Sequence, residues 1–128
     1  MNARDPHMPL QADEAAALGA FARQRWDDAI VPALTDYIAI PAKSPMFDAD
    51  WAAHGHIERV VRDAAQWVEA RKVPGLMLEV VRIPGRTPVI FFEIAGTKTG
   101  STDTVVAYGH LDKQPEFNGW RNDLGPWT

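Results

Sequence analysis

The sequence contains no cysteine. This absence excludes a disulfide framework, a thiolate zinc site and a cysteine nucleophile, so any metal would need His, Asp or Glu ligands. No uninterrupted apolar stretch approaches about 18 residues, and the N-terminus has no basic region followed by a long apolar segment. We therefore expect a cytoplasmic protein that does not enter a membrane.

Dense runs of lysine and arginine are also missing. The net charge is −4, and a nucleic-acid binder usually presents a basic patch or stripe. We therefore do not expect nucleic acid as a partner. The 128 residues are 46% hydrophobic and 23% charged, which is the composition of a soluble globular chain with enough apolar residues for a packed core.

Two stretches have the apolar spacing of helices. In the first, from Asp13 to Ile38, Asp13 is the candidate N-cap, and Pro32 predicts a kink or a restart because proline lacks the N–H of a helical hydrogen bond. The second, from about Asp50 to Arg71, has apolar residues at i, i+3, i+4 and i+7. It predicts one amphipathic helix that ends before Pro74-Gly75.

Three short runs rich in Val, Ile and Phe follow: LMLEVVRI (76–83), VIFFEI (89–94) and TVVAY (104–108). Turn-type residues separate them, so they predict strands, and the first two could form a hairpin across residues 84–88. The third is apolar on both faces, as expected of an interior strand covered by helices. Helices followed by strands predict an α/β fold in which N-terminal helices pack on a β-sheet.

His110 and Asp112 lie directly after the third predicted strand. If the extended conformation continues through Leu111, their side chains project to the same side. The imidazole could then offer one nitrogen to a metal while the carboxylate holds the other N–H. Alternatively, Asp112 could bind the metal itself or tune a neighbouring base. The structural reading is that His110 bonds a loop carbonyl and Asp112 caps the turn before Pro115.

The stretch TVVAYGHLDKQPEFNGWRNDLGPW (104–127) resembles the first metal-binding segment of the M20 family of zinc peptidases, especially its carnosinase-like dipeptidase branch. In that family a hydrophobic strand runs into Gly-His-x-Asp-x-Gln-Pro. The matching residues here are Gly109, His110, Asp112, Gln114 and Pro115. Leu111 and Lys113 stand where the family usually has Tyr and Val. The upstream helix ending in YIAIPAKSP (37–45) also fits the family layout.

The resemblance implies a fold, a site and a reaction. Residues 1–12 would be a flexible arm, and residues 13–128 would be the N-terminal portion of a zinc-peptidase (phosphorylase/hydrolase-like) catalytic domain. His110 would bind one of two zinc ions, and Asp112 would be the catalytic carboxylate that supports the site from beside it. The implied reaction is hydrolysis of dipeptides or short peptides by metal-activated water, with a glutamate as general base.

The family places the remaining zinc ligands, the general base and a small lid domain, which usually mediates dimerisation, after the segment that ends this sequence. We therefore expect the N-terminal part of a larger, homodimeric peptidase, which alone binds zinc weakly and is inactive. We do not expect substitute zinc ligands among the other His and Glu residues of interest, which are His7, His54, His56, Glu93 and Glu116. His54 and His56, two apart on one predicted helix, are expected to point in different directions.

Two other functions remain open from the sequence. The chain could be a self-contained, non-enzymatic α/β binding module in which Trp120 and Trp127 anchor a small ligand or partner and His110 is structural. It could also belong to an M20-type amidohydrolase or deacylase that acts on N-acyl amino acids, because the residues that would set the substrate lie downstream in that family.

Overall fold

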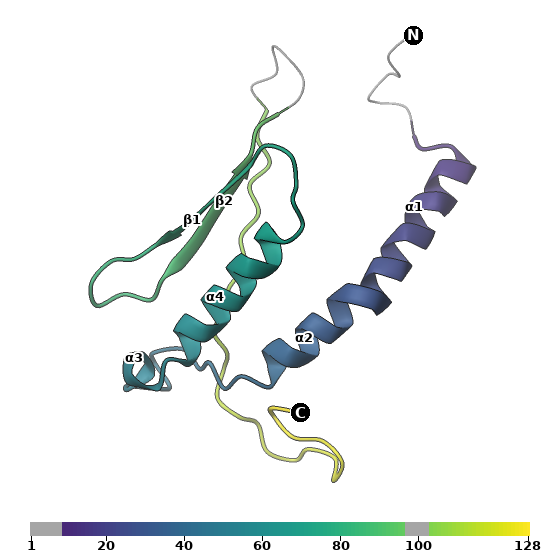
Figure 1. The fold of residues 1–128 in the computed structure, drawn as a ribbon. Helices are drawn as coiled ribbons and strands as arrows, with labels where there is room; N and C mark the ends of the chain where they lie inside the picture. The colour runs from purple at the N-terminus through teal and green to yellow at the C-terminus, as the bar shows by residue number, and fades with distance from the viewer. Residues whose placement is uncertain (1–8, 97–102) are drawn as a thin grey trace. The chain divides into compact units, whose positions relative to one another are not determined.

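A computed structural model describes residues 9–96 and 103–128 (Figure 1). Within these residues the chain combines helices with one two-stranded antiparallel sheet, so the predicted α/β character is confirmed. The chain divides into two compact units, Met1–Ile38 and Ala39–Thr128. No helix in the described part of the chain has the length and apolar character needed to cross a membrane.

The first unit is helical. Its elements are α1 (Ala12–Arg25), a π-helical segment η1 (Trp26–Ile30) and α2 (Val31–Ile38). The N-cap of α1 is Gln11, whose backbone N–H donates a hydrogen bond of 2.9 Å to Oε2 of Glu14. The predicted N-cap, Asp13, is therefore wrong: it lies in the first turn, where a carboxylate still favours the helix dipole.

The type of helix changes next to Pro32, where the sequence predicts a kink or a restart. Proline has no N–H to donate to the carbonyl four residues earlier, and its ring crowds that carbonyl. The chain widens just before the proline: η1 is π-helical, and the N–H of Val31 donates to the carbonyl of Trp26, five residues back. One wide turn thus accommodates the proline without ending the helical segment.

The predicted helix from Asp50 to Arg71 is divided in two. The structure has α3 (Trp51–His54) and α4 (His56–Glu69), and Gly55 between them has a φ of 71°. This left-handed conformation ends α3, while the N–H of Gly55 still donates to the carbonyl of Trp51. The prediction of one helix was wrong because apolar periodicity continues across a glycine that the backbone uses as a cap.

The predicted hairpin is confirmed. Strands β1 (Leu76–Val81) and β2 (Val89–Ile94) pair antiparallel, with Leu76 opposite Ile94 and Val81 opposite Val89. The connection between them contains Pro84, Gly85 and Pro88. The φ of Gly85 is 73°, a left-handed conformation that allows the tight reversal.

The buried core of the second unit lies around α4, which is next to the hairpin in Figure 1. The buried apolar side chains are Ile40, Ala42, Ile57, Val60, Val61 and Ala65. Four of these are on α4 and follow its predicted apolar face. An ion pair between Glu58 of α4 and Arg82, just after β1, also joins the helix to the hairpin.

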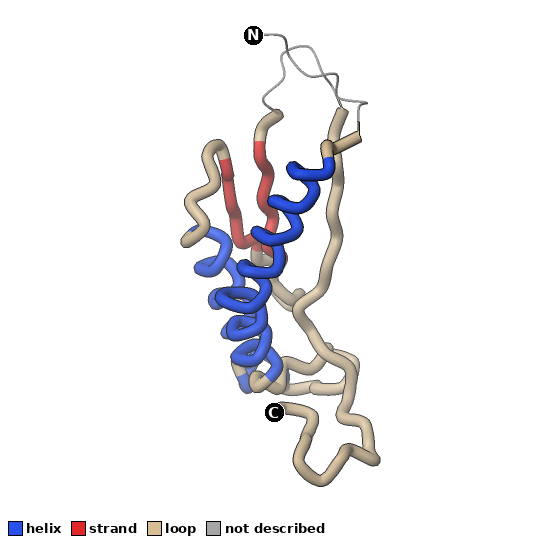
Figure 2. Tube along the Cα trace, turned by 90° about the vertical axis from the view of Figure 1, so that its right-hand side faces the viewer, coloured by secondary structure: helices blue, strands red, loops and turns tan. Residues whose placement is uncertain are grey.

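The third predicted strand is not formed. Residues 104–108 have no regular secondary structure and are drawn as loop in Figure 2, and Val105 and Val106 are 95% and 86% exposed. The prediction of a buried interior strand was therefore wrong. Branched apolar residues favour the extended conformation, but a strand also needs a neighbouring backbone to bond, and none of the described strands pairs with this segment.

Candidate functional site

His110 and Asp112 are in contact although the segment before them is not a strand. Nδ1 of His110 lies 2.9 Å from the backbone carbonyl oxygen of Asp112 and 3.2 Å from its Oδ1. The alternation of an extended chain therefore places both groups on one side, as the sequence predicts. The histidine side chain is 63% exposed.

The two contacts define the chemistry of the imidazole ring. Both atoms near Nδ1 of His110 are oxygens, and a carbonyl oxygen can only accept a hydrogen bond. The neutral tautomer that satisfies both contacts has its proton on Nδ1 and its lone pair at Nε2. This is the arrangement in which a carboxylate holds one ring nitrogen so that the other can bind a metal. The carbonyl contact is equally the bond expected of a structural histidine.

The residue that follows this pair is attached to the core of the second unit. The N–H of Lys113 donates to the carbonyl of Ala42 (2.8 Å), and the N–H of Ser44 donates to the carbonyl of Lys113 (2.9 Å). These bonds form a short parallel bridge between Lys43 and Lys113. The bridge joins the IPAKSP loop (40–45) to the segment that carries His110.

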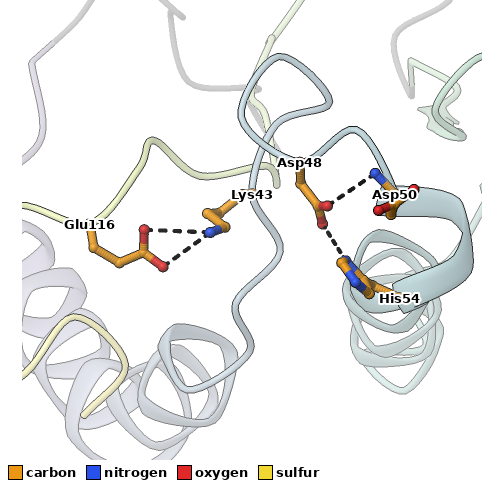
Figure 3. Close-up of polar contacts among 5 residues, drawn as sticks. All are labelled: Lys43, Asp48, Asp50, His54 and Glu116. Atoms are coloured by element: carbon orange, nitrogen blue, oxygen red, sulfur yellow. Dashed lines mark hydrogen bonds and ion pairs between the residues drawn. The ribbon is translucent and has the colours of Figure 1, made fainter.

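A side-chain ion pair supports the same attachment (Figure 3). Nζ of Lys43 lies 3.2 and 3.5 Å from the two carboxylate oxygens of Glu116. A hydrogen bond from its own backbone N–H, and then the bond from Lys43, hold the pKa of Glu116 below its ordinary value. Glu116, weighed as a substitute metal ligand, is therefore engaged with a lysine.

Figure 3 also shows a polar cluster at the start of α3. Oδ2 of Asp48 lies 2.9 Å from Nδ1 of His54, and Oδ1 of Asp48 accepts a bond of 3.2 Å from the N–H of Asp50. The hydrogen bond to Asp48 raises the pKa of His54 above its ordinary value, and the bond to His54 lowers the pKa of Asp48. Sequence reasoning missed this pair, whose only signal was an aspartate in a loop before a short helix.

His54 and His56 lie on different helices because Gly55 separates α3 from α4. Their ring centroids are 5.9 Å apart with an interplanar angle of 35°. The single continuous helix on which their expected directions were based does not exist. Within residues 9–96 and 103–128, no group of three or more His, Asp or Glu side chains is placed to hold a metal ion.

The remaining candidate residues from the sequence lie in different environments. Glu93 is exposed on β2. Nε1 of Trp120 donates to the carbonyl of Phe117 at 2.6 Å, and Trp127 lies beside Lys113. His7 lies outside the described residues.

No protein-family model matches the chain, and no curated protein matches it.

Proposed function

We propose that this chain supplies the first metal-binding segment of a two-zinc metallopeptidase of the M20 type, which hydrolyses dipeptides or short peptides with metal-activated water. In this proposal His110 binds one zinc ion through Nε2, and Asp112 orients the ring through Nδ1. The observation that carries it is the pair of contacts from Nδ1 to Asp112, within a segment whose motif resembles that of the family.

The donor set fits part of such a centre. One imidazole with a carboxylate partner is a suitable zinc ligand, and a bound zinc ion would polarise the substrate carbonyl and lower the pKa of water to about 7. The described residues offer no cluster of three ligands. The family that the segment resembles has its other ligands, its general base and a dimerising lid domain after this segment, and the proposal assigns those roles as the family does. The 128-residue chain alone is then inactive and binds zinc weakly.

The test is a zinc titration of the 128-residue chain, followed by isothermal calorimetry. Loss of a group that merely orients a zinc ligand typically lowers metal affinity about 10-fold or more. We expect His110→Ala, which removes the ligand itself, to weaken zinc binding by at least this factor. His56→Ala is the matched control, since it removes an imidazole that lies beside His54 and not beside Asp112. Equal zinc affinity in His110→Ala and the unaltered chain would contradict the proposal, as would a loss caused by His56→Ala instead.

Two observations favour a binding module as the second candidate. The contact from His110 to a backbone carbonyl needs no metal, and Trp120 is exposed nearby in sequence. A module of this kind would be indifferent to zinc, so the same titration separates the two functions. A deacylase of the same type would show the same zinc binding, and only the substrate of the complete enzyme, a dipeptide or an N-acyl amino acid, would distinguish it.

A further inference from the structure

Lys113 occupies the point at which the His110 segment meets the buried part of the second unit. Its backbone bonds on both sides to the loop of Ala42 and Ser44, and Ala42 is fully buried. Asp112 immediately precedes it. The backbone of Asp112 is therefore fixed from its C-terminal side, within one residue of the bridge.

The side chain of Lys113 strengthens the attachment. Nζ donates a hydrogen bond to the carbonyl of Ile40, a buried residue, and lies 5.4 Å from the centre of the Trp127 ring, within the range of a cation–π contact. Partial burial lowers the pKa of this lysine below its ordinary value. An ammonium group that donates to a backbone carbonyl makes a stronger hydrogen bond than a neutral donor would.

The apolar side chains just before the pair are not packed in a core. Val105, Val106 and Tyr108 are almost fully exposed, and the described residues contain no strand that pairs with them. The contact between His110 and Asp112 depends on the conformation of three successive residues. Lys113 is the next residue along the chain, and its backbone and side-chain bonds restrain this conformation from the C-terminal side.

We propose that Lys113 is a positioning residue for the metal ligand: its bonds to the Ile40–Ser44 loop hold Asp112 where it orients the His110 ring. This role deepens the proposed function and rests on it, because a held ring matters only if Nε2 binds a metal. The resembled family usually has Val at this position, whose side chain cannot donate a hydrogen bond.

The experiment compares the 128-residue chain with Lys113→Met, Lys113→Arg and Lys43→Met. Methionine keeps a long apolar side chain but has no donor, and arginine restores a charged donor. Lys43→Met is the matched control because it breaks the ion pair to Glu116 beside the same bridge. Two quantities are measured: the tautomer of metal-free His110, from ¹⁵N chemical shifts at a pH where the ring is neutral, and the zinc affinity. Amide signals of α4 and the hairpin report whether each variant is folded.

We expect Lys113→Met to lower the Nδ1-protonated fraction of His110 and to weaken zinc binding about 10-fold, as loss of a group that orients a ligand does. Lys113→Arg should restore both quantities in part, and Lys43→Met should leave both unchanged. The inference is overturned if Lys113→Met alters neither quantity, or if Lys43→Met alters them equally. A tautomer that responds to Lys113→Met in a chain whose His110 binds no zinc would overturn the proposed function while supporting the positioning of the ring.

Discussion

Asp48 and His54 form the closest side-chain pair of an imidazole and a carboxylate among the described residues, with Oδ2 and Nδ1 2.9 Å apart. The aspartate belongs to the loop before α3, and the histidine is the last residue of that four-residue helix. A helix this short has little stability of its own. The ion pair therefore connects its far end to the loop that precedes it.

The stability of this region should depend on pH. The pKa of His54 is raised above 6.5, so its contribution is fully present below pH 6.5 and is lost as the pH rises through the raised value. The pKa of Asp48 is lowered below 3.8, so its contribution is present above pH 3.8 and is lost as the pH falls through the lowered value. The Asp48–His54 pair therefore stabilises this region most between about pH 3.8 and pH 6.5.

Asp48→Asn tests this dependence, because the amide oxygen can still accept the N–H of Asp50 while the charge is removed. We expect the variant to lower the free energy of unfolding more at about pH 5.5 than at about pH 8.5. Urea unfolding at both pH values measures the difference. A loss that is the same at both would mean that the pair does not titrate as a unit. The variant His54→Gln should show the same pH dependence.

Gly55→Ala should destabilise the second unit. The φ of 71° at this position is strained for any residue with a Cβ, and such strain costs about 1 to 3 kcal/mol. Beyond its two chain neighbours, no described atom lies within 4 Å of the added Cβ, so the cost comes from the local backbone conformation and not from crowding by other residues. Gly96→Ala is the control, since its surroundings are also open and its φ lies outside the positive range; it should change stability by less than about 0.5 kcal/mol.

Val60→Ala and Val105→Ala compare the effect of the same substitution at a buried and at an exposed position. Val60 is 2% exposed on α4, so removing two methyl groups should reduce the free energy of unfolding by about 2 kcal/mol. Val105 is 95% exposed, and the same change there should alter it by less than about 0.5 kcal/mol. Chemical denaturation gives both values. A large loss at Val105 would contradict the exposed position of residues 104–108.

Pro32→Ala should convert the π-helical segment into a regular α-helix. The new N–H can donate to the carbonyl four residues earlier, and the ring no longer crowds that carbonyl, a constraint worth up to about 3 kcal/mol inside a helix. We expect slower amide hydrogen exchange near residue 32 and altered ¹³Cα shifts in Trp26–Ile30. Unchanged shifts in η1 would show that the wide turn has another cause.

The sequence predicts elements whose signal is local. The apolar face of α4 follows helical spacing, and the hairpin consists of two branched apolar runs around a turn with two prolines, so neighbouring residues suffice to define both. The α/β character of the chain was predictable for the same reason.

The features that were not predicted depend on distant residues or on one dihedral angle. Gly55 reads as a tolerated glycine within a helical pattern until its positive φ is known. Residues 104–108 have strand propensity, but pairing is a property of the neighbours that a segment finds. At the candidate site, the alternation of His110 and Asp112 was predictable, whereas the attachment of Lys113 to residues 40–44 was not, because nothing in the local sequence indicates that loop.

The bond from Lys113 to Ile40 joins residues 73 positions apart, and this distance along the chain has a consequence for the order of folding. Closing a loop of that length costs roughly 4 kcal/mol of chain entropy, whereas α4 and the hairpin form from neighbouring residues. The segment that carries His110 should therefore attach after α4 and the hairpin have formed. On warming, it should detach before they unfold, so that the imidazole and its carboxylate separate while the rest of the second unit is still native.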